Sequence, residues 1–286
     1  MNLNNLSLIR ETSTLLETHS YPDYDCVTGN VATFLSLQGT NPDAVLGSVL
    51  VLDAQDTHTS SPNFRNVGRH QLNKASSRNL LRFYEEEFDA TSARPANAPY
   101  VAIGDGFDMP WTPYFHQQHL EHGFLVLNGQ HAIDPYRTIT EFGEATPVTL
   151  DGDQWQTVPL QRCLVLESPN EFVDSGHVLP TTIHDKTSID HFLTCLEQQK
   201  LSVEQLSTDT WLMARARRVN HRYAQVTGIT AEEQLQESVD AWSKASEAVY
   251  IALRRHRRGR SVPTSYIQAI TSAINLDLQF LDRWSQ

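Results

Sequence analysis

The spacing of apolar residues divides the chain into a mixed first part and a helical second part. Short apolar runs of strand length, separated by turn-forming residues, predict strands at 49–52, 100–103, 148–150 and 162–166. From about residue 183 the apolar period becomes helical, with stripes at 189–196, 235–253 and 267–281. Gly259 and Pro263 separate the last two stripes, which predicts an antiparallel helical hairpin. We therefore predict an α+β domain over residues 1–182 and an α-helical domain over residues 183–286.

Two further helices are predicted in the first part. Residues 26–37 carry an apolar stripe at helical spacing, with Asp23 or Asp25 as the N-cap and Gly39 and Pro42 just after the end. Residues 76–88 are predicted to form the other helix, residues 53–73 a loop, and residues 3–18 a short strand or helix.

The predicted helix at residue 26 begins with a cysteine. A thiol in the first turn meets unpaired backbone N–H groups and the positive end of the helix dipole, and both favour the nucleophilic thiolate. Asp25 opposes this effect with its negative charge. The alternative is that Cys26 is a small buried residue without a chemical role.

A candidate base and its carboxylate partner follow about a hundred residues later. Asn128-Gly129 lies between two apolar runs and predicts a β-hairpin with a two-residue turn. Counted outward from that turn, Gly123 faces Asp134, so that His122 lies beside the carboxylate. A nucleophile, a base and a group that orients the base are thus present in the order Cys26, His122, Asp134.

These features together resemble a known family. The cysteine that opens a helix (DCVTGNVATFL), the acidic segment 101–111, and the His-x-x-His hairpin that ends in Asp-Pro are similar to the papain-like cysteine fold. More narrowly, residues 20–165 resemble the N-terminal domain of the butirosin biosynthesis protein H family, which is related to bacteriocin-processing peptidases. The resemblance implies a Cys-His-Asp acyltransferase that moves an acyl group from a carrier-protein thioester to an amine. It implies no cofactor of its own, since phosphopantetheine arrives with the donor.

Four residues around the hairpin are candidates for substrate binding. Asp105, Asp108 and Trp111 lie in the loop before it, where acidic groups suit a cationic amine, although aspartates in such loops are more often turn formers. His119 is a further candidate for substrate binding. If the register of the hairpin is shifted by three residues from the one predicted, His119 is itself the base in place of His122.

Histidine spacing leaves a metal site as another interpretation. Three imidazoles make an open zinc site, and the candidates are His116, His119, His122 and His131. No HExxH signature is present, so we rank metal binding below acyl transfer.

Charge is unevenly distributed. The net charge of −12 argues against general affinity for nucleic acid, yet residues 211–286 carry 11 Lys and Arg against 7 Asp and Glu. The cations form one cluster at 215–222 and another at 254–260. Cations near a helix C-terminus suit the dipole; the alternative is a dock for an acidic carrier protein at Arg254, Arg255 and Arg258.

Length and composition are those of a globular protein. The 286 residues contain three scattered cysteines, no apolar run long enough to span a membrane, and an N-terminus unlike a signal peptide. We therefore expect a cytoplasmic enzyme. The predicted activity is acyl transfer through Cys26; the alternatives are a thioesterase or peptidase with the same triad, or a silent module that binds a carrier protein or a peptide.

Overall fold

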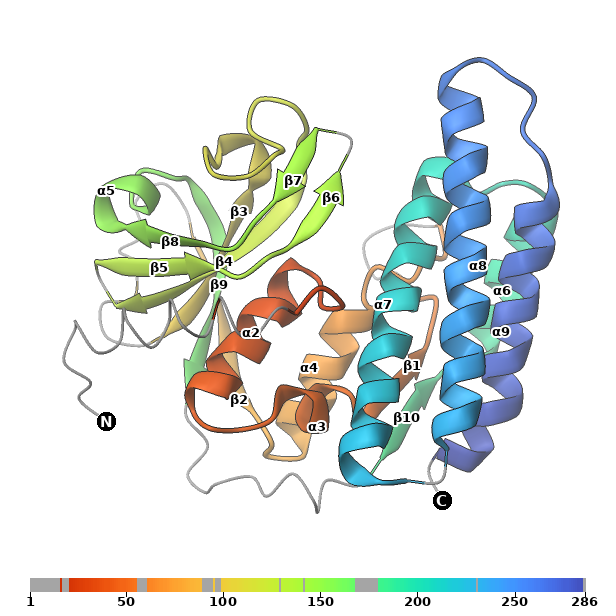
Figure 1. The fold of residues 1–286 in the computed structure, drawn as a ribbon, viewed down its shortest axis with the longest axis horizontal. Helices are drawn as coiled ribbons and strands as arrows, with labels where there is room; N and C mark the ends of the chain where they lie inside the picture. Colours follow the sequence, from red (N-terminus) through yellow and green to blue (C-terminus); the bar gives the residue numbers. More distant parts are fainter. Residues whose placement is uncertain are drawn as a thin grey trace. The chain divides into compact units, whose positions relative to one another are not determined.

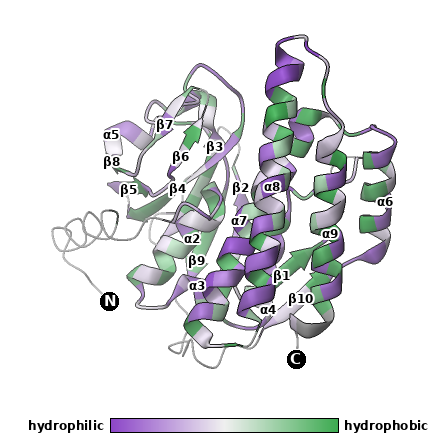
Figure 2. Cartoon of the chain, turned by 45° about the vertical axis from the view of Figure 1, so that its right-hand side comes forward, coloured by the Kyte–Doolittle hydropathy of each residue, from purple (hydrophilic) through white to green (hydrophobic). Residues whose placement is uncertain are grey.

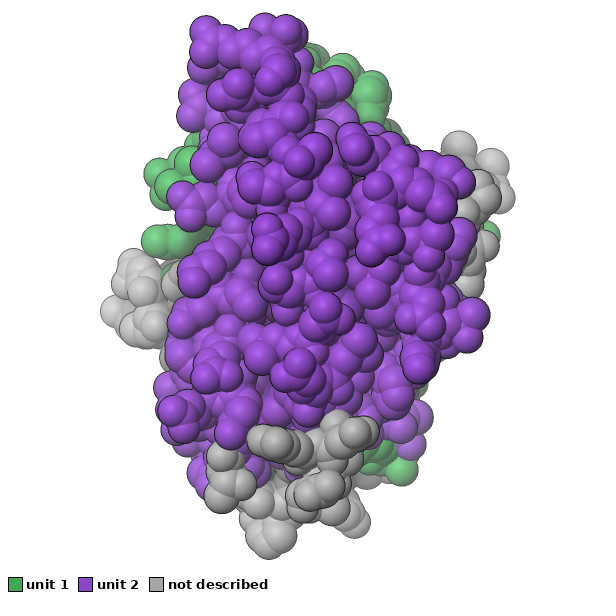
Figure 3. Space-filling view, turned by 90° about the vertical axis from the view of Figure 1, so that its right-hand side faces the viewer, with its two compact units in different colours: residues 1–42, 78–173 green, residues 43–77, 174–286 purple. Residues whose placement is uncertain are grey.

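The computed structural model describes residues 16, 21–55, 61–88, 95, 99–128, 130–140, 142–167, 180–229 and 231–284 (Figure 1). The N-terminal segment 3–18, predicted to be a short strand or helix, lies outside these residues apart from Leu16. The chain forms two compact units: unit 1 contains residues 1–42 and 78–173, and unit 2 contains residues 43–77 and 174–286 (Figure 3).

Unit 1 is built on a six-stranded antiparallel sheet. The strands, in spatial order, are β2 (Arg82–Glu87), β9 (Leu160–Glu167), β3 (Tyr100–Asp105), β4 (Glu121–Asn128), β5 (His131–Asp134) and β8 (Val148–Asp151). The short strands β6 (Thr138–Thr140) and β7 (Gly143–Ala145) form a separate hairpin, and α5 (Gly152–Trp155) and the 3-10 turn η1 (Gly106–Asp108) fill the connections. The predicted strands at 100–103, 148–150 and 162–166 are confirmed.

Helix α2 (Cys26–Leu37) lies against β3 and β4 of this sheet. Alternation along β4 places Phe124 and Val126 in an apolar cluster with Trp155, whereas a side chain at Gly123 would point toward the carbonyl of Cys26. The sheet therefore buries both faces, one against the helix and one against the Trp155 cluster.

Unit 2 is mainly helical. Its elements are α3 (Pro42–Leu46), whose first residue belongs to unit 1, β1 (Val49–Leu52), α4 (Val67–Ser77), β10 (Thr181–His184), α6 (Lys186–Glu197), α7 (Val203–Thr227), α8 (Glu232–Arg257) and α9 (Ser265–Trp284). Strands β1 and β10 pair in parallel. Hydrophobic and hydrophilic residues alternate along α8 (Figure 2), as expected for a helix with one buried face.

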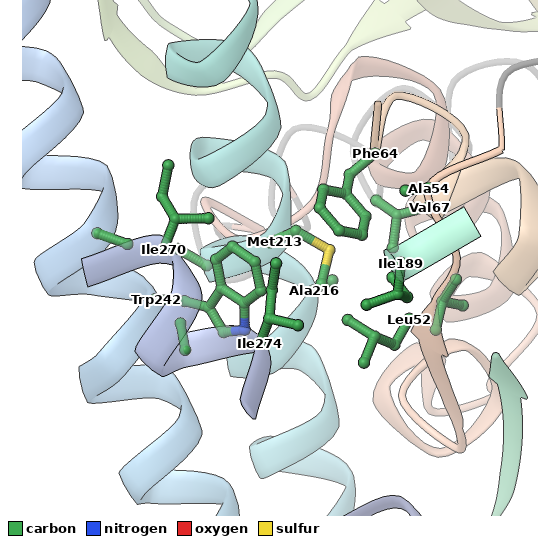
Figure 4. Close-up of a cluster of buried hydrophobic side chains, with 14 of the residues drawn as sticks. Leu52, Ala54, Phe64, Val67, Ile189, Met213, Ala216, Trp242, Ile270 and Ile274 are labelled. Atoms are coloured by element: carbon green, nitrogen blue, oxygen red, sulfur yellow. The ribbon is translucent and has the colours of Figure 1, made fainter. Parts of the chain in front are cut away.

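Apolar side chains from six segments of unit 2 meet in one core (Figure 4). The labelled members are Leu52, Ala54, Phe64, Val67, Ile189, Met213, Ala216, Trp242, Ile270 and Ile274. The Phe64 ring contacts both Phe192 and Trp242, at centroid distances of 4.8 and 5.8 Å. The predicted helical stripes supply part of this core, and residues 49–67 and helix α7 supply the rest. Gly259, with φ +62°, lies in the turn between α8 and α9, as predicted.

The predicted division at residue 182 is wrong for residues 43–77, which belong to unit 2. Strand β1 pairs with β10, about 130 residues later. The side chain of Asn220 in α7 donates to the carbonyls of Gly47 and Val49, and Arg217 donates to that of Val51 at 2.8 Å. These backbone groups find their partners in the helical segment, so 43–77 folds with it.

The predicted helix at 76–88 is also wrong, and the predicted loop at 53–73 is wrong from Val67 onward, whereas residues 53–55 and 61–66 contain neither helix nor strand, as predicted. Helix α4 begins at Val67 and ends at Ser77, and Asn79 then adopts φ +56°, a left-handed conformation that ends helices. Residues 82–87 form the edge strand β2, in which backbone pairing with β9 overrides the helical preference of the glutamates. None of the described helices combines the length and apolar character needed to cross a membrane.

Candidate active site

Cys26 is the first residue of α2, as predicted. The Asp25 carboxylate caps the helix by accepting hydrogen bonds from the backbone N–H groups of Val27 at 2.9 Å and Thr28 at 2.7 Å. The Thr28 hydroxyl accepts from the Asp25 N–H in return, which completes a capping box. This cap leaves the N–H of Cys26 without an acceptor in the described part of the chain. The thiol is partly exposed, with Sγ 3.7 Å from the carbonyl oxygen of Glu121.

His122 lies on β4 and is buried, with 1% of its surface exposed. Its Nε2 atom is 2.7 Å from Oδ2 of Asp134, and since a carboxylate can only accept, Nε2 carries the proton. The other ring nitrogen, Nδ1, has no hydrogen-bond partner among the described residues. Nδ1 is therefore the atom available to the thiol.

The electrostatic environment keeps the His122 ring protonated. Burial lowers the pKa of His122, but the charge and hydrogen bond of Asp134, with a further contribution from Cys26, outweigh burial and raise this pKa to about 10. The thiol is thus close enough to influence the ring, although the contact lacks the geometry of an ordinary hydrogen bond.

Asp134 is held in place by two further donors. The indole N–H of Trp111 donates to Oδ2 at 3.0 Å, and the backbone N–H of Tyr136 donates to Oδ1 at 3.0 Å. Trp111 was predicted to bind substrate, but its indole N–H is engaged by the carboxylate of Asp134. Its N–H orients the carboxylate, and its ring meets that of Phe124 edge-on at 5.3 Å.

The hairpin register differs from the prediction by one residue. Leu125 faces Ile133 and Val126 faces Ala132, and the pairing then shifts so that Asn128 faces His131. Gly129, in the predicted turn, lies outside the described residues. The Asn128 side chain accepts from the backbone N–H of His131 at 3.0 Å, which stabilises the irregular end of the hairpin. His122 and Asp134 still meet, because residues diagonal across two strands remain within reach.

Asp105, predicted to bind substrate, has its oxygens engaged within the loop that follows β3. The carboxylate accepts from the backbone of Phe107 at 3.0 Å and of Leu120 at 3.2 Å, and lies 2.7 Å from Nδ1 of His119. Burial would raise the pKa of Asp105, but these hydrogen bonds outweigh it and lower the pKa. The residue thus organises the loop that leads into β4, rather than offering a free carboxylate to an amine.

Asp108 and His119 are on the surface. Asp108 is exposed, and the His119 side chain is 74% exposed, stacked on Phe107 at 4.2 Å. His119 therefore lacks the burial and the Asp134 partner that distinguish His122.

The histidines considered for zinc do not converge. Each of three histidines has a different aspartate as its neighbour. His119 pairs with Asp105 and His122 with Asp134, while Nδ1 of His131 lies 3.9 Å from Oδ1 of Asp151. His116, with φ +55°, stacks on Phe115 at 3.9 Å. Within the described ranges, no group of three or more His, Cys, Asp or Glu residues is arranged to hold a metal ion.

Two groups near Cys26 were not predicted from the sequence. Asn30 is fully buried and links α2 to β4, and Arg162 on β9 forms an ion pair with Glu121 at 2.7 Å and another with Glu85. Asn30 lies one helical turn after Cys26, and this spacing is the sequence signal that could have identified it.

The two basic clusters of unit 2 have different environments. In the first, Arg217 is buried with Asp277, and Arg222 contacts Asp43 at 3.0 Å, so these cations stabilise the unit itself. The second cluster is exposed at the end of α8. There Arg254 lies over the Tyr250 ring at 5.8 Å, Arg255 donates to the Ser261 carbonyl at 2.7 Å, and Arg258 is the C-cap.

No protein-family model matches the chain, and no curated protein matches it significantly in sequence.

Proposed function

We propose that the protein is a cysteine-dependent acyltransferase that moves an acyl group from a carrier-protein thioester to an amine. The observation that carries this proposal is the pairing of a cysteine at a helix N-terminus with a buried histidine whose far nitrogen is held by Asp134. A papain-like arrangement of unit 1 is part of the same proposal, which the resemblance of residues 20–165 supports. The chemistry requires a nucleophile, a proton carrier and an orienting group, and these three residues are of the right types.

In the first half-reaction, Cys26 attacks the thioester carbonyl as a thiolate, its proton having passed to His122 to give the imidazolium. A bond forms between Sγ and the acyl carbon, the bond to the carrier sulfur breaks, and the imidazolium of His122 gives its proton to the departing thiolate. The raised pKa of His122 suits this step, because the ring begins it protonated. The backbone N–H of Cys26, which the Asp25 cap does not use, would donate a hydrogen bond to the oxyanion.

In the second half-reaction, an amine attacks the acyl-cysteine. Neutral His122 accepts a proton from the attacking nitrogen, the bond from the acyl carbon to Sγ breaks, and Cys26 leaves as a thiolate beside the restored imidazolium. Asp134 stays ionised throughout and holds the ring in one orientation.

The basic cluster at the end of α8 is the proposed dock for the acidic carrier protein. Arg254, Arg255 and Arg258 are exposed, so charge reversal there should weaken carrier binding without unfolding unit 2. Titration of a fluorescent carrier protein at low and high salt measures the effect. Unchanged affinity in the triple Arg→Glu variant would remove the dock from the proposal.

Mass spectrometry of the intact protein tests the acyl transfer. The probe is an acetyl thioester of N-acetylcysteamine, which reproduces the end of the phosphopantetheine arm. We expect an added acetyl group in the wild type and none in Cys26→Ala. Addition of candidate amines then separates the outcomes: an amide product supports a transferase, whereas free acid alone indicates a thioesterase or peptidase. A protein that no thioester acylates would indicate a module that only binds.

A further inference from the structure

One buried amide connects the candidate nucleophile to the strand that carries the candidate base. The side chain of Asn30 in α2 is fully buried. Its Nδ2 atom donates to the carbonyl of Cys26 at 2.5 Å and to the carbonyl of Gly123 in β4 at 2.9 Å. Since Gly123 directly follows His122, the amide bridges the backbones at the two reacting groups.

The orientation of this amide is determined by its surroundings. Both partners are carbonyl oxygens, so the nitrogen must face them. The other end of the amide, Oδ1, is buried and has no hydrogen-bond partner among the described residues. A buried acceptor without a partner destabilises the folded state. Because the unpaired oxygen of Asn30 destabilises the fold, the stability of the protein does not explain this residue. Its role in positioning the groups of the candidate active site does.

The first turn of α2 lies against β4 at Gly123. A Cβ atom at Gly123 would lie 3.2 Å from Cγ1 of Val101 and 3.5 Å from the Cys26 carbonyl. The tighter of these contacts is with the neighbouring strand β3, whereas the contact with α2 is an ordinary van der Waals distance, so the first turn of α2 lies against β4 at this position and one amide reaches both carbonyls.

We propose that Asn30 is a positioning residue that fixes Cys26 against His122 by tying the first turn of α2 to β4. This rests on the proposed role of Cys26 as the nucleophile. Asn30 donates its hydrogen bonds to the two backbone carbonyls and not to the thiol or the imidazole, so it acts by holding the two backbones at one separation. Loss of the bridge lets the two groups drift apart, and small displacements of reacting groups have large effects on rate.

Two substitutions separate the bridge from the helix. In Asn30→Thr the hydroxyl can still donate to the carbonyl four residues earlier, as Thr33 donates to Gly29 at 2.9 Å in the same helix. This variant loses only the bond to Gly123. Asn30→Asp keeps the size of the side chain but directs carboxyl oxygens toward two carbonyls. Thr33→Val is the matched control, because it removes a buried hydroxyl of α2 that does not reach the sheet.

The readouts are the rate of Cys26 acylation by the acetyl thioester and the NMR titration of His122. We expect kcat to fall by about tenfold to a hundredfold in both Asn30 variants with little change in KM. We also expect the His122 titration to move to lower pH, since Cys26 then contributes less to it. Thr33→Val should retain the wild-type values. Folded Asn30 variants with wild-type rates and titration would overturn the proposal.

Two further measurements keep the test decisive. Alkylation of Cys26 by iodoacetamide requires no acyl transfer. Slower alkylation in both variants supports the bridge, whether or not a thioester acylates the wild type. A wild type that no thioester acylates would refute only the proposed function. If neither variant folds, NMR of the wild type replaces them. The NMR signal of the Asn30 side-chain amide should then shift as His122 titrates, and a signal that stays unmoved contradicts the proposal.

Discussion

Replacement of the buried carboxylate beside the histidine, Asp134→Asn, is the perturbation with the largest calculable effect. Oδ2 of Asp134 receives N–H groups from His122 at 2.7 Å and from Trp111 at 3.0 Å, while Oδ1 receives the Tyr136 N–H at 3.0 Å. An amide of the same shape has one acceptor and one donor end. Either orientation places its NH2 group against at least one of these donors, so the site cannot be satisfied as before.

The magnitude follows from the charge on His122. With Asp134 present, the pKa of His122 is about 10, against an ordinary 6.5. Without the carboxylate, burial lowers this pKa and only Cys26 opposes it, so we expect a fall of about three units or more. The ring becomes neutral at pH 7, and acylation should slow on the order of a thousandfold. Because one partner of a buried charged pair is lost, unfolding should also become easier by about 3 kcal/mol.

NMR titration of the His122 imidazole, assigned by comparison with His122→Gln, measures the pKa, and intact-mass kinetics measure acylation. Asp153→Asn, a change at an exposed acid of the same unit, is the control and should alter neither quantity. A folded Asp134→Asn variant in which His122 still titrates near pH 10 would refute the reasoning about this pair.

Four other outcomes are expected. The folded-state pKa of His122 is raised, so its contribution to stability should be complete below about pH 6.5 and be lost as the pH rises toward 10; denaturant unfolding across this range should show the loss in the wild type but not in His122→Gln. Trp111→Phe removes one donor to the buried carboxylate and should slow acylation by about tenfold; an unchanged rate in stopped-flow assays would assign the indole another role. His119→Ala should leave acylation within about threefold of wild type if His122 is the base, and complete loss would make His119 the base instead. Asp277→Asn leaves the buried Arg217 without its charge partner and should destabilise unit 2 by about 3–5 kcal/mol; chemical denaturation with no shift in midpoint would contradict that.

Local signals were sufficient to predict the helix at Cys26. Asp25 supplies the cap, the apolar stripe supplies the period, and Gly39 adopts the left-handed φ of +76° just beyond the end. The meeting of His122 with Asp134 was also predictable, because a tight hairpin keeps nearby residues together even when its register slips by one.

Features that depend on distant partners were not predictable. The glutamates of β2 favour a helix by themselves, and only the pairing with β9 makes them a strand. Residues 43–77 join unit 2 because β1 finds β10 and because Arg217 reaches the Val51 carbonyl. The sequence shows that Arg217 belongs to a basic cluster, but it does not show that this side chain is buried. The burial of Arg217 against Asp277 depends on packing between α7 and α9.

The central claim is that one particular thiol of the three in this chain takes the acyl group. Cys163 and Cys195 are buried, and burial, followed by the charge of Glu86, raises the pKa of Cys163 to about 12, so these two thiols should be inert. Peptide mapping of the native protein after a brief exposure to the acetyl thioester is the most direct measurement. The account predicts the acetyl group on the peptide that contains Cys26, and its disappearance in His122→Gln. Acetylation confined to Cys163 or Cys195, or none at any cysteine, would contradict it.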